Sequence, residues 1–333
     1  MKTILVLGAT GTLGAYVALH FKDKGYKVIA TGHRRTDNGF FSEHGIEYHT
    51  VDITKPTDFD GLPQSGIDVV ADFAGALPAS MKGYDATLYI NSIFGGTYNV
   101  LEYMRRAGIQ KIIFPESLFD ISYMFGSKTP IPADSERKAP LTGDHAMYVI
   151  AKIAAVDTIL HYHAVYGIKA FILRLSRVYT YHPNPYTYTD GVKVMVSDRF
   201  LIKKAENSEP IEIWGDPKRL LETCAMPDFL QIVEKCVESD GEGGIYNIGS
   251  GGSTLEERIK GIVEVFSPKD SPSSIIYAPE KKNAMQFVLD IEKTKRDLGY
   301  IPRYSWLDYC RWFKEEREKQ RFAKLWGKEE DYE

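Results

Sequence analysis

The sequence predicts an α/β protein with a doubly wound parallel sheet and a smaller C-terminal α/β lobe. The chain opens with an apolar run that breaks into glycines at positions 8, 11 and 14 and then becomes helical. Strand-like runs follow at 27–31, 47–51, 69–73, 111–114 and 169–175, with helix-like segments between most of them. This alternation is typical of parallel strands covered by helices on both faces. Wide apolar faces on the segments 97–107 and 147–166 support the same fold.

The glycine-rich loop after the first strand predicts a dinucleotide site. Gly8 permits a tight turn, Gly11 lets a pyrophosphate approach the backbone, and Gly14 lets the next helix pack close to the strand. Phosphates at such loops lie on the free N–H groups and the positive end of the helix dipole. Glycines alone are a weak signal, but here a strand precedes them and a periodic helix at 12–24 follows. The expected cofactor-binding residues of the loop are Gly8, Thr10, Gly11, Thr12, Leu13 and Gly14.

The helices predicted at 97–107 and 147–166 end at Gly108 and Gly167, as helices commonly do. One apolar face of each helix is expected to cover the sheet. The remaining apolar positions indicate either a homodimer contact or burial within one subunit, and the sequence supports both interpretations equally.

The second half of the chain predicts a smaller lobe. A Pro- and Tyr-rich loop at 179–191 excludes a regular helix and is typical either of a substrate-contacting loop or of a loop packed by its own rings. Helices are then expected at 200–207, 228–238 and 255–266, with short β-runs at 211–214 and 245–248 and one long, solvated, charged helix at 306–326. The expected domains are a dinucleotide-binding domain at 1–175 with a return near 222–248, a substrate lobe at 176–221 and 249–320, and a charged C-terminal tail at 321–333.

Composition excludes several function classes. A net charge of -4 and the absence of a long basic run argue against nucleic acid as a partner. Cys224, Cys236 and Cys310 lack metal-ligand spacing and predict buried thiols in a reducing compartment. No metal site is expected among the histidines either. No apolar stretch reaches membrane-spanning length, so we expect a cytoplasmic protein with a small-molecule substrate and no membrane partner.

Tyr148 and Lys152 form the candidate catalytic pair. At i and i+4 they share one face of a helix. An adjacent ammonium and a positively charged nicotinamide would favour the phenolate, lowering the pKa of Tyr148 until it can act as a general base. A Tyr and a Lys at this spacing are common on helix surfaces, so the pair gains its meaning from the glycine loop.

These residues, in this order, resemble the extended short-chain dehydrogenase/reductase superfamily, in particular its nucleotide-sugar epimerase/dehydratase branch with a Rossmann-type fold. The resemblance covers most of the chain, including segments LRLSRVY at 173–179, WGD at 214–216 and YNIGSG at 246–251. It implies that Ser117 hydrogen-bonds the substrate hydroxyl and that Lys152 also holds the nicotinamide ribose. It also implies further cofactor contacts by Tyr148, Asp52, Ile53, Phe73, Ala74 and Gly75, with Asp52 facing the adenine.

The end of the second strand departs from the NAD-using members of the superfamily. Those members carry an Asp or Glu for the ribose 2′-hydroxyl, whereas this chain reads His33, Arg34 and Arg35. Two arginines attract a 2′-phosphate, so NADP is favoured over NAD, although a solvated basic turn is the alternative.

Other departures concern the substrate. Leu118 and Phe119 follow Ser117 where sugar dehydratases carry Asp and Glu, which disfavours a 4,6-dehydratase. Leu221 replaces an arginine that binds a diphosphate in many relatives, and Arg177 replaces an asparagine. Arg177 and Arg219 are therefore candidate substrate-binding residues.

His182 follows RVYTY, where some relatives place a second acid or base. It is a candidate for that role, although a structural or solvent-facing histidine is the favoured interpretation.

The sequence thus predicts an NAD(P)-dependent epimerase that acts on a secondary hydroxyl of a sugar or nucleotide sugar. The alternatives are an NADP-dependent reductase or dehydrogenase of a carbonyl or sugar substrate, and a non-catalytic dinucleotide-sensing protein. A homodimer is expected.

Overall fold

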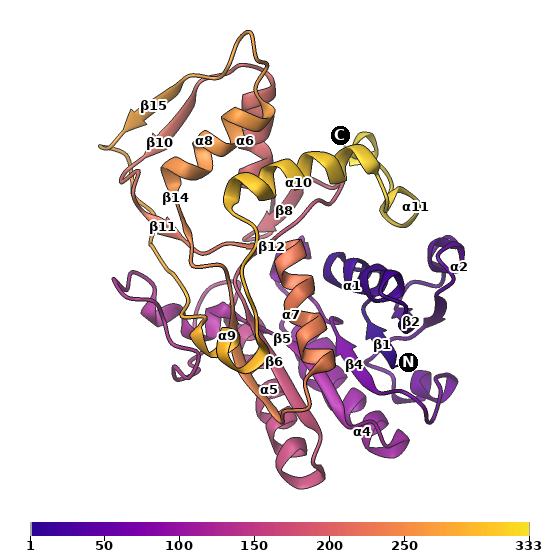
Figure 1. Cartoon of the computed structure of the whole chain (residues 1–333). Helices are drawn as coiled ribbons and strands as arrows, with labels where there is room; N and C mark the ends of the chain where they lie inside the picture. Colours follow the sequence, from indigo (N-terminus) through magenta and orange to yellow (C-terminus); the bar gives the residue numbers. More distant parts are fainter. Residues whose placement is uncertain (1, 333) are drawn as a thin grey trace.

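The protein is described by a computed structural model that covers residues 2–332, and one parallel seven-stranded sheet forms its centre (Figure 1). Its strands are β1 (Thr3–Leu7), β2 (Lys27–Gly32), β3 (Glu47–Thr50), β4 (Val69–Asp72), β5 (Lys111–Ser117), β6 (Lys169–Leu175) and β13 (Gly243–Ile248). Their spatial order is β13-β6-β5-β4-β1-β2-β3. The predicted fold class is confirmed. The strand order reverses at β1: β2 and β3 lie on one side of it, and the chain then crosses to β4 on the other side. Such a switch point is where ligands bind in doubly wound sheets.

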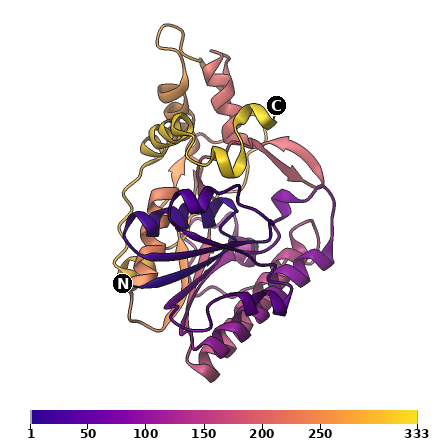
Figure 2. The same cartoon turned by 90° about the vertical axis from the view of Figure 1, so that its right-hand side faces the viewer.

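Helices cover both faces of the sheet (Figures 1 and 2). The main ones are α1 (Thr12–Asp23) and α7 (Met226–Glu238) on one face, and α4 (Gly96–Ala107) and α5 (Ala146–Tyr166) on the other. Side chains alternate across each strand, so Val6 belongs to the core under α1 and α7 whereas Leu5 belongs to the core under α4 and α5.

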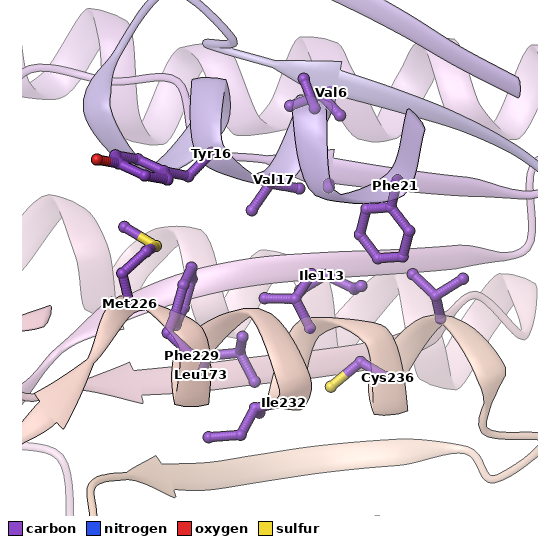
Figure 3. Close-up of a cluster of buried hydrophobic side chains, with 14 of the residues drawn as sticks. Val6, Tyr16, Val17, Phe21, Ile113, Leu173, Met226, Phe229, Ile232 and Cys236 are labelled. Atoms are coloured by element: carbon purple, nitrogen blue, oxygen red, sulfur yellow. The ribbon is translucent and has the colours of Figure 1, made fainter. Parts of the chain in front are cut away.

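Figure 3 shows the first of these cores, where α1 and α7 meet over the sheet. Val17 and Phe21 of α1 lie opposite Phe229 and Ile232 of α7, and Ile113 of β5 lies beneath them. All five side chains are fully buried. Each contributes about 1.5–3 kcal/mol through removal of apolar surface from water, and together they fix α1 and hence the loop before it.

The helical stretch before β5 begins earlier than position 97 and is irregular. It consists of α3 (Ala86–Tyr89), the π-helix η3 (Ile90–Gly95) and α4. A π-turn holds one extra residue per turn, which accommodates an insertion and often occurs near functional sites. The hydroxyl of Ser92 in η3 accepts a hydrogen bond from the Ala76 N–H at 3.1 Å and thereby holds the turn that follows β4.

The second lobe contains three helices and short strands. They are β8 (Tyr186–Thr189), β9 (Val192–Met195), α6 (Ser197–Glu206), β10 (Ile211–Trp214), β11 (Leu220–Leu221), β14 (Ser253–Thr254), α8 (Leu255–Phe266), β15 (Ile275–Ala278) and α10 (Trp306–Lys319). Ile211 and Ile213 of β10, Ile262 of α8 and Phe313 of α10 belong to its core. β7 (Val178–Tyr179) pairs with β12 (Cys224–Ala225) where the chain passes between the lobes.

The remaining short elements lie in the connections. They are α2 (Phe40–Glu43), η1 (Pro56–Gly61), η2 (Pro78–Ser80), η4 (Leu118–Met124), α9 (Glu292–Leu298), α11 (Ala323–Trp326) and η5 (Glu329–Tyr332).

Part of the Tyr-rich segment expected as a loop is a β-hairpin. β8 and β9 pair antiparallel, and Asp190 and Gly191 between them have φ of 49° and 77°. An Asp-Gly pair with positive φ at both residues is the preferred two-residue connection of a hairpin.

The single long helix expected at 306–326 is wrong. α10 ends at Lys319 because Gln320 adopts a left-handed conformation, with φ 45° and ψ 37°, and α11 follows. The break turns Phe322, Leu325 and Trp326 toward the sheet domain, where all three are buried. Figure 1 shows α11 beside α1 and α2. A solvated helix would have left these apolar side chains in water, which explains the difference.

The three cysteines are buried free thiols. Within residues 2–332, the structure contains no helix with the length and apolarity needed to span a bilayer.

Candidate active site

The glycine-rich loop joins β1 to α1 at the carboxyl edge of the sheet. Gly8 has φ of 71°, and a Cβ there would lie 2.8 Å from the backbone of Phe73 in the turn after β4. A Cβ at Gly14 would lie 2.4 Å from the carbonyl oxygen of Gly8, so a larger residue would push α1 away from the strand. α1 begins directly after Gly11, and the free N–H groups of its first turn include those of Thr12 and Leu13. The loop therefore forms a cradle that fits a pyrophosphate.

The end of β2 lies beside this cradle. The Ala9 N–H donates to the carbonyl oxygen of Thr31 at 2.7 Å. A Cβ on Gly32 would lie 2.6 Å from the Thr10 hydroxyl, so Thr10 occupies the space next to the strand end. Thr10 is therefore a buried wall of the site rather than a solvent-facing residue of the loop.

The basic turn that follows β2 is exposed at all three positions, His33, Arg34 and Arg35. The Arg34 guanidinium donates to the carbonyl oxygen of Leu325 at 3.1 Å, and the Arg34 carbonyl accepts from the Tyr48 hydroxyl at 2.8 Å. This turn is thus held in place on both sides while its cationic side chains remain accessible to an anion.

The predicted adenine-side residues lie on the next connections. Asp52 accepts hydrogen bonds from the Thr54 N–H at 3.1 Å and hydroxyl at 2.7 Å. Burial by itself would raise the pKa of Asp52. The hydrogen bonds from Thr54 and the neighbouring Lys55 outweigh burial and keep this pKa below its ordinary value. Ile53 is buried, and a Cβ on Gly96 would lie 2.5 Å from it, which explains why α4 begins with a glycine at this contact.

The turn after β4 contains Phe73, Ala74 and Gly75. The Ala74 N–H donates to the Asp72 carboxylate at 3.1 Å, and Gly75 has φ of 131°, which residues with a side chain rarely adopt. The backbone of this turn packs directly against Gly8 and thus borders the glycine-rich loop on its β4 side.

The structure brings Ser117, Tyr148 and Lys152 together. Ser117 ends β5, and Tyr148 and Lys152 lie on the first turns of α5. The Lys152 ammonium donates to the carbonyl oxygen of Pro115 at 2.6 Å and lies 4.3 Å from the centre of the Phe114 ring. The Ser117 side chain lies near enough to the Tyr148 phenol to favour its ionised form. The three side chains are all buried, and this is the arrangement that the sequence predicts for a proton-transfer site.

Two buried carboxylates near this trio, those of Asp72 and Glu116, are not predicted by the sequence motifs. Asp72 ends β4 and Glu116 precedes Ser117; Glu116 is on the same face of β5 as Phe114, toward α5. One oxygen of each carboxylate, Oδ2 of Asp72 and Oε2 of Glu116, is buried without a hydrogen-bond partner among the described residues. The signal was available in the sequence as two acids at the ends of apolar strands.

These carboxylates act electrostatically on Lys152. Burial raises the pKa of Asp72 to about 6 and that of Glu116 to about 7. Burial lowers the pKa of Lys152, and the charges of Glu116 and Asp72 oppose that effect. The charge of the buried ammonium is therefore favoured by two nearby acids, although it forms no direct ion pair with either.

The expected lowering of the pKa of Tyr148 by Lys152 is not what the protein alone produces. Burial raises the pKa of Tyr148, the Glu116 carboxylate raises it further, and the nearby Ser117 side chain only partly opposes them. The Lys152 ammonium is committed to the Pro115 carbonyl oxygen. Ionisation of the phenol thus requires additional positive charge at the site.

A buried ion pair supports the segment that follows Ser117. The Arg174 guanidinium donates to the Asp120 carboxylate at 2.9 Å and 2.8 Å, and it donates to the Ala133 carbonyl oxygen at 2.9 Å. Arg174 and Asp120 are both fully buried, so this pair fixes η4 to β6 beneath the catalytic residues.

The candidate substrate arginines lie in different surroundings. Arg177 pairs with Asp198 of α6, lies over the Tyr179 ring, and is 47% exposed. Arg219 is buried and donates to the Asn283 side chain at 2.9 Å, while its Nε has no partner among the described residues. Of the two candidate arginines, Arg177 is therefore the one whose guanidinium is partly exposed to solvent.

The structure does not bring His182 to the catalytic trio. Its Nδ1 accepts from the Asn184 N–H at 3.0 Å, and its ring lies 4.5 Å from that of Trp326. Burial lowers the pKa of His182 to about 4, so the ring is neutral near pH 7 and packs against the C-terminal segment. A role as second acid or base finds no support in these contacts.

A cavity of about 520 Å³ lies one side chain away from Tyr148, which does not itself line it. Its wall includes Tyr89, whose ring lies 5.8 Å from that of Tyr148, and Asp144, which hydrogen-bonds His145. The full lining is Pro78, Met81, Lys82, Gly83, Tyr84, Tyr89, Gly143, Asp144, Asp190, Gly191 and Val192. The volume suits a small polar ligand, and the hairpin of the second lobe forms one side of it.

Across residues 2–332, no three His, Cys, Asp or Glu side chains gather closely enough to hold a metal ion.

Comparison with known proteins gives consistent matches. GDP-mannose 3,5-epimerase 1 of Oryza sativa subsp. japonica is 22% identical over 325 residues, which cover 96% of this chain and 83% of that protein. A putative UDP-glucose 4-epimerase of Methanocaldococcus jannaschii is 25% identical over 304 residues, which cover 90% of this chain and 93% of that protein.

Solved structures share the fold. The UDP-glucose 4-epimerase of Thermotoga maritima, crystallised with UDP-glucose, superposes with a TM-score of 0.72 at 20% identity, covering 96% of this chain and 99% of that chain. The Bordetella bronchiseptica enzyme WbmG, in complex with NAD, gives 0.74 at 18% identity, covering 97% and 96%.

The model of one family matches residues 4–249, a range that includes the glycine-rich loop and the trio of Ser117, Tyr148 and Lys152. The resemblance inferred from the motifs is confirmed, and the chain belongs to the NAD dependent epimerase/dehydratase family.

Proposed function

We propose that the protein is an NAD(P)-dependent epimerase that inverts a carbon bearing a secondary hydroxyl in a sugar or nucleotide sugar. The observation that carries the proposal is the placement of Ser117 at the end of β5 beside Tyr148 and Lys152 of α5, with the 520 Å³ cavity on the far side of the Tyr89 ring that packs on Tyr148. The family match and the epimerases among the relatives support the same reaction class.

In this proposal the chain's own residues move one proton and orient the alcohol. Ser117 hydrogen-bonds the substrate hydroxyl, and Tyr148 takes its proton as the C–H bond of the same carbon breaks. The bound oxidised dinucleotide supplies the hydride acceptor and a positive charge that favours the phenolate. When the resulting ketone turns over and regains its hydride on the opposite face, Tyr148 returns the proton. Lys152 supports Tyr148 and the nicotinamide ribose, with Asp72 and Glu116 as its counter-charges.

For the cofactor we propose NADP in preference to NAD. The support is the exposed basic turn of His33, Arg34 and Arg35 at the end of β2, where no acid is present to repel a 2′-phosphate. The cofactor contacts follow the predicted set, with the pyrophosphate on the glycine-rich loop and the adenine near Asp52 and Ile53.

For the substrate we propose a nucleotide sugar, with Arg177 as the more exposed of the two candidate arginines. The structures of two relatives contain UDP-glucose or UDP. Arg219 is the second candidate, although its side chain is buried and bound to Asn283.

An NADP-dependent reductase is the second candidate function, and the basic turn favours it. A reductase exchanges its cofactor at every turnover, whereas an epimerase regenerates it in place. We therefore expect purified protein to retain its dinucleotide and to convert sugar nucleotides without a net change in the absorbance of reduced nicotinamide.

A Tyr148→Phe variant tests the proposal directly. Loss of the phenol removes the base, so we expect turnover to fall by about 10²–10⁴ while dinucleotide binding persists. UDP-glucose, UDP-galactose and GDP-mannose serve as trial substrates, with products followed by NMR. Tyr277→Phe, at an exposed tyrosine of the second lobe, is the matched control. Unchanged turnover in Tyr148→Phe would refute the assignment of the base.

We also propose a homodimer formed through the η3–α4 and α5 face. Ile90, Phe94 and Tyr98 recur every four residues along this helical stretch and are 42%, 41% and 49% exposed, and Ile150 of α5 is 36% exposed. Apolar side chains grouped on one helical face mark an interaction surface.

A further inference from the structure

The C-terminal segment, residues 320–332, contacts the glycine-rich loop. The indole N–H of Trp326 donates to the carbonyl oxygen of Thr10 at 3.0 Å, although the two residues are 316 positions apart. Trp326 is only 6% exposed. The first N–H groups of α1 are free to meet an anion, while the Thr10 carbonyl group of the same loop is held by the end of the chain.

Aromatic packing holds Trp326 in that position. Its ring stacks on Phe322 at 4.4 Å, and Phe322 lies 4.5 Å from Tyr16 of α1. On another side the ring lies 4.5 Å from His182 of the second lobe. Trp326 is therefore fixed between the helix that carries the phosphate cradle and the substrate lobe.

The same segment reaches the basic turn after β2. The carbonyl oxygen of Leu325 accepts from Arg34 at 3.1 Å, and that of Lys324 accepts from the Asn38 side chain at 3.1 Å. The Lys324 ammonium also pairs with Glu43 of α2. The cation that we assign to the 2′-phosphate therefore takes its position from the C-terminal segment.

The far end of the segment is tied to the second lobe. Glu329 of η5 pairs with Arg199 of α6 at 2.6 Å, and the Tyr332 hydroxyl bonds the carbonyl oxygen of Trp326. The segment consequently bridges both lobes across the cofactor edge of the sheet.

A loop that is already held in its binding conformation loses little freedom when a ligand binds, and such preorganisation raises affinity. Among related complexes most differences in affinity appear in the dissociation rate. A contact that fixes the phosphate cradle should therefore slow cofactor release.

We propose that Trp326 is a positioning residue of the dinucleotide site and that the segment 320–332 slows release of the cofactor. This inference rests on the proposed function, because it assumes that the glycine-rich loop binds NADP or NAD. Slow release fits an epimerase, which completes its cycle without cofactor exchange, better than it fits a reductase.

The test measures NADPH and NADH dissociation from the full chain by stopped-flow fluorescence after displacement with excess NADP. Trp326→Phe keeps a ring of similar shape and removes the N–H donor. We expect dissociation to accelerate on the order of five- to tenfold, as for loss of one buried hydrogen bond. Trp326→Leu, which also removes the ring, should accelerate it further. Trp214→Phe, at a half-exposed tryptophan of β10, is the matched control and should release the cofactor as wild type does.

Thermal unfolding without cofactor separates positioning from a merely structural role. Faster release in Trp326→Phe, with an association rate and melting temperature close to those of wild type, supports the proposal. Unchanged release in both Trp326 variants overturns this inference alone. A wild-type protein that binds neither dinucleotide overturns the proposed function, and this inference with it.

Discussion

At the scale of single residues, Glu116 is the least expected component of the site. It is 1% exposed and lies beside Tyr148 and Lys152, and its Oε1 accepts the Ser117 N–H at 2.8 Å. Besides burial, the Asp120 carboxylate raises the pKa of Glu116 even though Asp120 pairs with Arg174. The charges of Lys152 and Arg137 oppose this rise, but burial disfavours the charge of Lys152 itself. Glu116 therefore resists ionisation and also opposes ionisation of Tyr148.

This arrangement predicts a pH-dependent stability that Glu116→Gln removes. Burial raises the pKa of Glu116 from 4.5 to about 7 in the folded protein. Between these values the folded state holds a proton that the unfolded state has lost, so the free energy of unfolding should fall as pH rises from about 4.5 to 7. We expect the fall in melting temperature between pH 5 and pH 8 to be smaller in Glu116→Gln than in wild type.

The matched control is Glu318→Gln, which removes an exposed carboxylate from α10. It should follow the wild-type dependence on pH. Parallel curves for wild type and Glu116→Gln would show that Glu116 is ionised alike in the folded and unfolded states.

At the scale of elements, two glycines of the glycine-rich loop have different roles: the fold requires a glycine at position 14, whereas the proposed cofactor requires one at position 11. A Cβ at Gly14 would lie 2.4 Å from backbone oxygen, whereas one at Gly11 would meet only the Gly8 oxygen at 3.3 Å. Gly11 also has φ of −85°, which alanine adopts readily.

We therefore expect Gly11→Ala to fold with a melting temperature near that of wild type but to bind NADPH and NADH weakly, because its methyl group enters the pyrophosphate site. Gly14→Ala should lose both stability and binding, because α1 must shift. Calorimetric unfolding and fluorescence titration measure the two effects. Equal losses of stability in both variants would contradict this division of roles.

Elements with strong local signals were predictable from the sequence. The parallel sheet follows from apolar runs that alternate with periodic helices, and the trio follows from a Ser at a strand end and a Tyr-Lys pair one helical turn apart. The expected site residues that line the cradle and trio lie where those motifs place them.

The remaining features depend on contacts that local patterns do not encode. The break after Lys319 arises because three apolar side chains pack on α1, more than 290 residues away in the chain. His182 packs on Trp326, which the same C-terminal segment brings to it. The π-helix η3 packs against α5, another contact between distant parts of the chain. In each case tertiary packing outweighs local sequence preference.

At the scale of the whole molecule, the two lobes meet where chemistry is proposed. The sheet domain supplies the cradle and the trio, and the second lobe supplies the hairpin that lines the cavity. The segment 320–332 then contacts both lobes. Cofactor retention and substrate access are therefore properties of the assembled chain rather than of either lobe.

The apolar face of η3–α4 and α5 leads to a prediction about assembly. Phe94 is 41% exposed at the centre of the stripe formed by Ile90, Phe94 and Tyr98. A carboxylate there would be desolvated in a dimer but hydrated in a monomer, so Phe94→Glu should shift the protein toward monomer. Light scattering after size-exclusion chromatography, at micromolar concentration, measures the mass of wild type and variant. Ile276→Glu, at a comparably exposed apolar residue of β15, should leave the dimer intact. A monomeric wild type, or a dimeric Phe94→Glu variant, would rule out this face as the interface.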